Sequence, residues 1–145
     1  MAFKLIVGLD GHSSGERAVA HAKRLAGMMD GAELILLYVI EWSPYTFQTP
    51  EENEQRHKRR EEEIEQAQSR VVAPALERLK SEGVSARGLV RHGHVADLLN
   101  RAAVEEGADQ IIVARSSEGG FAARVFGTST ANLVMSSSVP VTVVA

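Results

Sequence analysis

The sequence predicts a single α/β domain built as a three-layer sandwich, with a five-stranded parallel sheet between two layers of helices. Five short apolar segments, bounded by Gly, Asp or Pro, are typical of strands buried on both faces of a parallel sheet. They alternate with four segments whose apolar residues recur at helical spacing. The chain of 145 residues has the usual size of one domain, so we expect residues 1–145 to form one unit.

The first strand is expected at residues 3–9, where an apolar run ends in Asp10-Gly11. Ser13 stands three residues before Glu16, which is the spacing of a capping box, so we expect a helix to begin there. Apolar residues at helical spacing follow, and Gly31 is a stop signal. This segment predicts one complete β-α unit.

A second strand is expected at residues 34–40, and the segment Thr49-Pro50-Glu51-Glu52 then has the pattern of another capped helix start. Residues 51–63 contain no apolar residue and cannot pack on a core, so we expect a solvated helix entry. Pro74 lies inside the apolar pattern that follows, which predicts a kink or a restart of the helix.

The remaining strands are expected at residues 84–90, 110–114 and 139–144. A helix ended by Gly107 separates the first two of these strands. Another helix, beginning at Gly127-Thr128, precedes the last strand. Five strands that alternate with four helices indicate an open parallel sheet covered on both faces, for which we expect the flavodoxin-like strand order 2-1-3-4-5.

The composition excludes several classes of protein. A hydrophobic fraction of 44% and a charged fraction of 24% are those of an ordinary soluble domain, and a net charge of −3 argues against a nucleic-acid partner. The chain has no cysteine, so disulfides and thiolate sites are excluded. No segment approaches the ~20 apolar residues of a membrane helix, and no signal peptide is recognisable. We therefore expect a cytoplasmic protein that does not contact a membrane.

Ligands of open parallel sheets bind beyond the carboxyl ends of the strands, where the strand order reverses. Asp10 could there accept hydrogen bonds from ribose hydroxyls, or it could cap the following helix. Val39 could lie against an adenine ring or belong to the core. The hydroxyls of Thr128, Ser129 and Thr130, together with the N–H groups of a helix start, could hold phosphates, although a plain helix cap is the alternative.

Three segments resemble the universal stress protein family, and the similarity covers the whole chain. The segment Val7-Gly8-Leu9-Asp10-Gly11 is similar to the family's opening strand, although His12 replaces the serine that usually follows. Residues 108–113 resemble its fourth strand and residues 140–144 its closing strand. The resemblance implies a fold related to that of the adenine-nucleotide hydrolases.

ATP-binding members of this family carry the signature Gly, two residues, Gly, nine residues, then Gly with Ser or Thr. Gly127-Thr128 fits its end, but Ala114 and Ser117 stand where the two leading glycines belong. Ser117 cannot adopt a positive φ without cost, and Glu118 would repel a triphosphate. The nucleotide-binding residues that the resemblance implies are Gly8, Leu9, Asp10, Val39, Val113, Ala114, Ser116, Ser117, Gly127, Thr128, Ser129 and Thr130.

The resemblance thus implies a dimeric regulatory module that binds ATP with Mg²⁺, or AMP, and is not an enzyme. The alternative is a universal stress protein that binds no nucleotide and acts through protein contacts of the charged helix at 51–60. The apolar final strand Val141-Val144 predicts a homodimer, because an uncovered sheet edge is an association site. We expect no catalytic residues and no metal site, and we interpret His92-Gly93-His94 as a turn.

Overall fold

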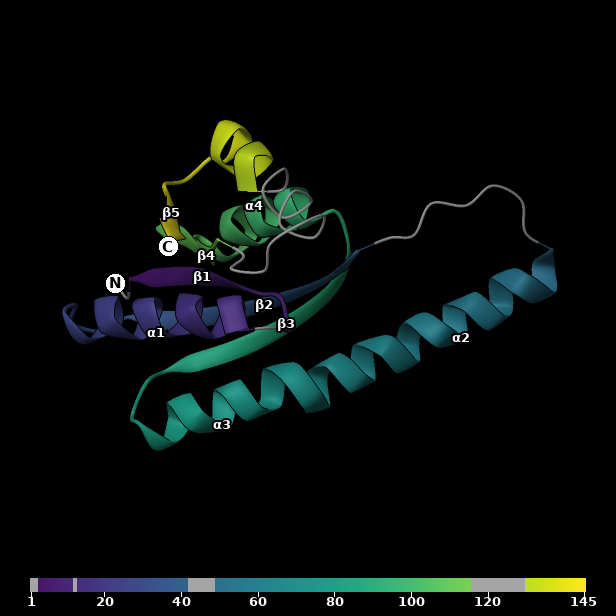
Figure 1. The fold of residues 1–145 in the computed structure, drawn as a ribbon, viewed down its shortest axis with the longest axis horizontal. Helices are drawn as coiled ribbons and strands as arrows, with labels where there is room; N and C mark the ends of the chain where they lie inside the picture. Colours follow the sequence, from purple (N-terminus) through teal and green to yellow (C-terminus); the bar gives the residue numbers. More distant parts are fainter. Residues whose placement is uncertain (1–2, 12, 42–48, 116–129) are drawn as a thin grey trace.

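The structure is a computed structural model that describes residues 3–11, 13–41, 49–115 and 130–145 (Figure 1). Five strands and the helices between them form the predicted α/β fold. In chain order the elements are β1 (Lys4–Leu9), α1 (Ser13–Gly27), β2 (Glu33–Glu41), α2 (Pro50–Ala67), the π-helical turn η1 (Gln68–Val72), α3 (Ala73–Ser81), β3 (Ala86–Gly93), α4 (Val95–Glu106), β4 (Gln110–Ala114) and β5 (Val141–Val144). The described part of a last helix covers residues 130–136, and we call it the C-terminal helix.

All five strands are parallel and follow the order β3-β2-β1-β4-β5. The five-stranded parallel sheet is therefore confirmed, but the predicted order 2-1-3-4-5 is wrong for β3. Crossovers between parallel strands are right-handed, and α1 and α3 lie on the same face, so β3 is added beyond β2. The order still reverses beside β1, between its neighbours β2 and β4.

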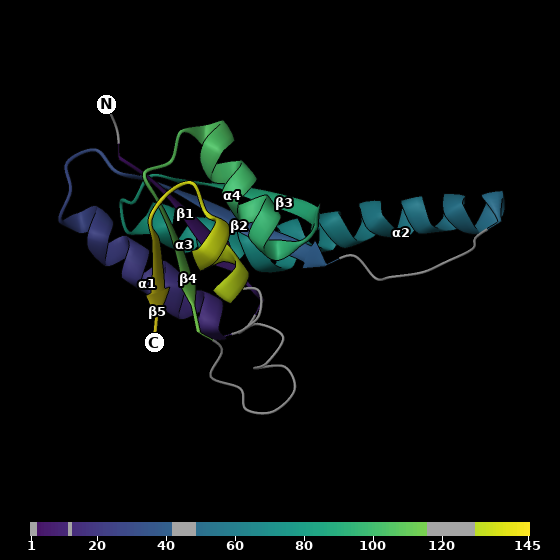
Figure 2. The same ribbon diagram turned by 90° about the horizontal axis from the view of Figure 1, so that it is seen from above.

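Helices lie on both faces of the sheet (Figure 2), and an apolar cluster fills the space on each face. Leu5 and Val7 of β1 point toward α1 and α3, whereas Ile6 points toward α4 and the C-terminal helix. This alternation is the two-residue period of a strand, and all three side chains are fully buried. Burial on both faces therefore fixes the positions of the central strands β1, β2 and β4, including their carboxyl ends.

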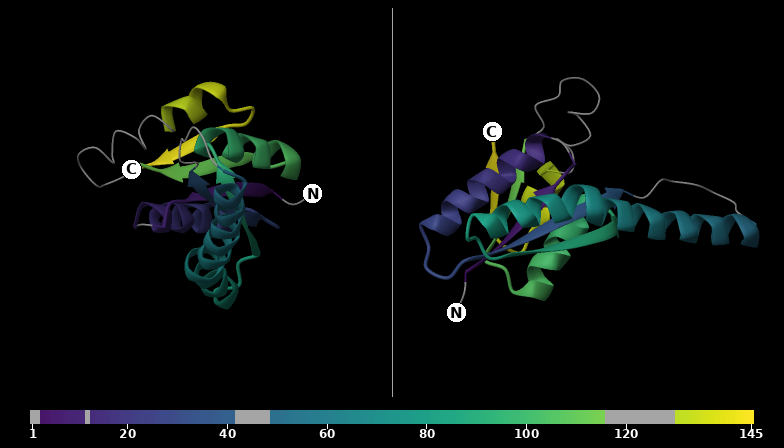
Figure 3. Two further views of the ribbon diagram at one scale, coloured as in Figure 1. Left: turned by 90° about the vertical axis from the view of Figure 1, so that its right-hand side faces the viewer. Right: turned by 90° about the horizontal axis from the view of Figure 1, so that it is seen from below.

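The second helical region is one long rod, α2–η1–α3, that runs far beyond the sheet (Figures 1 and 3). Thr49 and Glu52 form the predicted capping box, since each side chain accepts a hydrogen bond from the other's backbone N–H at 3.1 Å. The predicted restart at Pro74 is confirmed, because the π turn ends at Val72 and Pro74 lies in the first turn of α3.

The helix α4 ends as predicted at Gly107, which has a φ of 64° and is the left-handed residue that closes a helix. The fourth strand has the predicted bounds Gln110–Ala114. Within the described part of the chain, no helix has the length and apolar character needed to cross a membrane.

Candidate functional site

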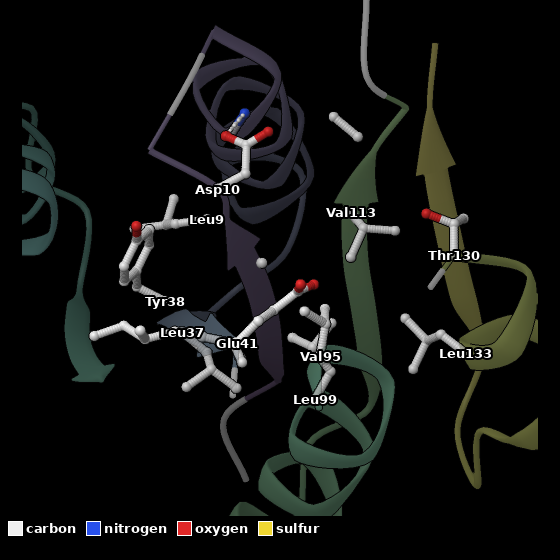
Figure 4. A pocket seen from close by; sticks show the side chains of 15 residues that line it. Leu9, Asp10, Leu37, Tyr38, Glu41, Val95, Leu99, Val113, Thr130 and Leu133 are labelled. Carbon is white, nitrogen blue, oxygen red and sulfur yellow. Dashed lines mark hydrogen bonds between the residues drawn. The ribbon is translucent and has the colours of Figure 1, made fainter. Parts of the chain in front are cut away.

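A cavity of about 250 Å³ opens at the carboxyl ends of β1, β2 and β4, where the strand order reverses (Figure 4). This volume is slightly below the usual range for ligand pockets, about 300–1,000 Å³. Its lining residues are Gly8, Leu9, Asp10, Gly15, Leu37, Tyr38, Val39, Ile40, Glu41, Val95, Leu99, Val113, Ala114, Thr130 and Leu133.

Aliphatic side chains from two strands and one helix line the apolar part of the cavity. Val39 extends from β2, Val113 from β4 and Leu99 from α4, and all three belong to or pack on the same apolar cluster. Gly8 keeps this space open, because a Cβ added there would lie only 3.0 Å from Cγ1 of Val113. The result is an apolar slot between the sheet and α4.

Asp10 joins the cavity to the start of α1. Its Oδ1 accepts a hydrogen bond of 2.9 Å from the backbone N–H of Gly15, and its Oδ2 accepts another from the hydroxyl of Ser14. Gly15 is suited to this position, because a Cβ there would lie 2.8 Å from Asp10 Oδ1. Asp10 therefore caps the start of α1, which is one of the two roles that the sequence left open for it. The expected capping box of Ser13 is replaced, since Ser13 already lies inside α1.

The edge of β2 supplies backbone groups to the cavity. β1 ends at Leu9, opposite Tyr38, but β2 continues to Glu41 while remaining paired with β3. The N–H of Glu33 donates toward β1 and that of Leu34 toward β3. Because these directions alternate along a strand, the backbone N–H and C=O of Glu41 face the side where β1 has ended.

Two carboxylates stand at the mouth of the cavity, those of Asp10 and Glu41, and both are visible in Figure 4. Thr130, the first described residue of the C-terminal helix, lies across the opening from them. The carboxylates favour hydroxyl donors and repel anions, so this part of the mouth suits a sugar better than a phosphate.

Seven of the predicted residues line this cavity, namely Gly8, Leu9, Asp10, Val39, Val113, Ala114 and Thr130. The other five, Ser116, Ser117, Gly127, Thr128 and Ser129, lie outside the described residues. Sequence reasoning missed the contributions of Tyr38, Val95 and Leu99. Val95 and Leu99 recur at helical spacing on the face of α4 that packs on the sheet. Nothing in that pattern indicated that the same face forms a wall of the cavity.

Arg17 ties α1 to the end of β4, where the chain leaves the sheet beside the cavity. Its guanidinium donates hydrogen bonds to the backbone carbonyl of Arg115 and, at 3.3 Å, to that of Ala145. Arg17 therefore fixes the point from which residues 116–129 depart.

The His92-Gly93-His94 segment forms the end of β3 and the start of α4. Nε2 of His92 is buried, has no hydrogen-bond partner among the described residues, and lies 3.8 Å from a carboxylate oxygen of Glu63 on α2. The predicted turn is wrong for His92 and Gly93, because both are paired with β2 as the last residues of β3, and α4 follows directly after His94. In the described ranges no group of three potential metal ligands comes together.

A sequence model of the universal stress protein family matches residues 1–145. Universal stress protein UspA from Lactobacillus plantarum has a similar structure, with a TM-score of 0.78, 18% identity and coverage of 99% of this chain and 97% of that one. A universal stress protein in complex with cAMP has a TM-score of 0.64 and 25% identity, covering 99% and 96% of the two chains.

A third similar structure is a universal stress protein family protein from Arabidopsis thaliana with AMP bound. It has a TM-score of 0.65 and 16% identity, with 98% of this chain and 90% of that one covered. None of the curated protein sequences matches the chain.

Proposed function

We propose that this chain, which belongs to the universal stress protein family, is a regulatory module that binds an adenine nucleotide in the cavity at the ends of β1, β2 and β4. One observation carries the proposal. The cavity combines an aliphatic slot, the edge of β2 beyond the end of β1 and a carboxylate mouth at the point where the strand order reverses.

The aliphatic slot and the strand edge fit a purine base. Val39 and Val113 offer flat apolar contact from two strands, and Leu99 closes the slot from α4. The backbone N–H and C=O of Glu41 form a donor and acceptor pair beside it. Adenine presents the complementary pair, a ring nitrogen and an amino group, along one edge. The strand edge thus reads the base without needing a particular side chain.

The mouth of the cavity fits the rest of a nucleotide. The ribose hydroxyls donate to the carboxylate of Asp10, which lines the mouth of the cavity. The phosphate side lies toward Thr130, whose hydroxyl can donate a hydrogen bond to an anion. The similar structure that is 25% identical contains cAMP, which supports an adenine nucleotide as the class of ligand.

We further propose that the module is a homodimer and does not hydrolyse its ligand. β5 is an edge strand, and Val143 exposes 41% of its surface there, which favours pairing with a second β5. Unchanged nucleotide after prolonged incubation, measured by chromatography, would support the second point; product formation would overturn it.

Thermal unfolding of nucleotide-free protein tests ligand binding. ATP with Mg²⁺, AMP and cAMP are each added at millimolar concentration. A ligand at 100 times its dissociation constant stabilises the folded state by about 2.7 kcal/mol. At about 2–4 °C per kcal/mol, the midpoint should rise by roughly 5–10 °C with the nucleotide that fits.

A pocket-filling variant and a matched control make this test specific. Val113→Trp places an indole in the slot and should abolish the shift, whereas Val104→Trp makes the same change at an exposed position of α4 and should keep it. If no nucleotide raises the midpoint of the folded wild-type protein, the proposal is wrong. The function would then rest on protein contacts alone.

A further inference from the structure

A second cavity, of about 260 Å³, opens between α1 and the η1–α3 part of the rod, and we call it the helix groove. Both α1 and α3 pack on the face of the sheet opposite α4 (Figure 3). The helix groove shares Leu9 and Gly15 with the candidate nucleotide cavity. Its other lining residues are Gly11, Glu16, Val19, Ala20, Lys23, Arg70, Val71, Pro74, Ala75, Arg78, Leu79 and Glu82.

Aliphatic side chains make up much of the lining. Val19 of α1 and Ala75 of α3 are half-buried and pack on the same apolar cluster, to which the fully buried Leu79 belongs. Val71 and Pro74 extend this apolar lining along the rod. A hydrocarbon chain that covers these side chains removes apolar surface from water, which is favourable in proportion to the area covered.

The helix groove is elongated and is bounded at one end. Lys23 of α1 and Glu82, which follows α3, form an ion pair at 2.5 Å that joins the two helices there. Glu16 lines the groove nearer the start of α1, and from Glu16 to Lys23 the helix rises about 10 Å. The groove therefore suits a narrow, extended ligand better than a ring system.

Two guanidinium groups on the rod side of the groove have no charged partner. Within the described part of the chain, neither Arg70 nor Arg78 forms an ion pair or a side-chain hydrogen bond. The lining contains three basic and two acidic side chains, and one of the acidic ones, Glu82, is already paired with Lys23. The rod side of the groove therefore favours an anion.

The π turn η1 helps to place both arginines on this side. Eight residues of a regular α-helix make two turns and about 80° more, which would set Arg70 and Arg78 apart around the axis. The wider i→i+5 winding of Gln68–Val72 turns less per residue and reduces this offset. Such turns are frequent at functional sites, and two residues of this one, Arg70 and Val71, line the groove.

We propose that the helix groove binds an amphipathic anion, namely an unbranched hydrocarbon chain with a carboxylate headgroup. The chain lies along Val19, Ala75 and Leu79, and the carboxylate accepts charge-assisted hydrogen bonds from Arg70 or Arg78. A cationic headgroup on the same chain is disfavoured, because it meets two unpaired guanidinium groups. The proposal does not rest on nucleotide binding, since the two ligands occupy cavities on opposite faces of the sheet.

NMR titration of ¹⁵N-labelled protein with decanoate, octanoate and decyltrimethylammonium tests the proposal. Millimolar decanoate should shift the amides of Val19, Ala20 and Ala75 saturably and leave those of Gly8 and Glu41 unchanged. Decanoate should bind about fivefold or more tightly than decyltrimethylammonium, which has the opposite charge. It should bind about tenfold more tightly than octanoate, because two further CH₂ groups are covered.

Two variants at exposed positions of the groove separate the chain from the headgroup. Ala20→Trp places an indole over the groove and should abolish decanoate binding, whereas Val104→Trp makes a similar change at an exposed position of α4 and should keep it. Arg70→Gln/Arg78→Gln should remove the preference for decanoate over decyltrimethylammonium. Lys80→Gln/Arg101→Gln is the control, because it removes two exposed positive charges outside the groove and should keep that preference.

Several results would overturn the proposal. It is wrong if decanoate causes no saturable shifts in wild type, or if the shifts gather around Gly8 and Glu41. It is also wrong if the two amphiphiles with opposite charges bind wild type equally, which would indicate apolar adsorption alone. Unchanged decanoate binding by Ala20→Trp, or an unchanged preference in Arg70→Gln/Arg78→Gln, would contradict it as well.

Discussion

Replacing Asp10 by alanine tests the structural role assigned to the junction between β1 and α1. The substitution removes the acceptor for the N–H of Gly15, a loss that typically costs about 1 kcal/mol at a helix start. It also leaves the hydroxyl of Ser14 without its partner, and Ser14 is only 3% exposed. An unsatisfied buried hydroxyl costs about 1–3 kcal/mol, so the total loss should be roughly 2–3 kcal/mol.

Urea unfolding followed by circular dichroism measures this loss, which corresponds to a fall in midpoint temperature of about 5–10 °C. In the double variant Asp10→Ala/Ser14→Ala the orphaned hydroxyl is gone. In the Asp10→Ala background, Ser14→Ala should therefore lower the free energy of unfolding by about 1 kcal/mol less than it does in the wild-type protein. A double-mutant cycle measures this difference. Asp30→Ala, at an exposed turn, is the control and should change stability by less than about 0.5 kcal/mol. A loss below 0.5 kcal/mol for Asp10→Ala, with no coupling to Ser14, would refute the reasoning.

Two further predictions concern the rest of the fold. Gly88→Ala should lower the free energy of unfolding in urea by about 1–3 kcal/mol, because η1 lies directly over Gly88. Gly27→Ala is the control and should be neutral or stabilising, because the space around Gly27 is open. Equal effects of the two substitutions would contradict this packing. The hydrogen bond from Arg87, opposed by partial desolvation, lowers the pKa of Glu106 below its usual 4.5. Ionised Glu106 therefore stabilises the folded state above pH 4.5, and this stabilisation is lost as the pH falls through the lowered pKa. Arg87→Met should therefore make stability between about pH 5 and pH 3 less dependent on pH, and an unchanged slope in acid unfolding curves would contradict the assignment.

Much of the fold could be predicted from the sequence because its signals are local. The apolar run of β4, the capping box at Thr49 and the stop at Gly107 each depend on neighbouring residues, and each appears in the structure as expected. The order of the strands depends instead on which face each helix covers. Apolar periodicity shows that a helix has a buried face but does not say which face of the sheet receives it, so β3 was placed wrongly.

The site divides in the same way. Residues at the ends of β1, β2 and β4 could be predicted because parallel strands end at one edge of the sheet, and Gly8, Val39 and Val113 do line the cavity. The wall that α4 contributes could not be predicted, because Leu99 has the sequence pattern of a core residue. In the structure Leu99 both lines the cavity and is 98% buried in the core. The strand edge at Glu41 could not be predicted either, because it exists only where β2 extends beyond the end of β1. That depends on the register between two segments that are far apart in the sequence.

Heteronuclear NMR of ¹⁵N-labelled protein titrated with AMP tests the central claim most directly, because it reports both binding and its place. We predict saturable shifts of the backbone amides of Gly8, Asp10 and Glu41, with those of the exposed helix α2 unchanged. The same titration of Val113→Trp should leave the spectrum unaltered. If the wild-type amides around the cavity do not move at millimolar AMP, cAMP or ATP, or if the shifts gather elsewhere on the fold, the cavity is not a nucleotide site.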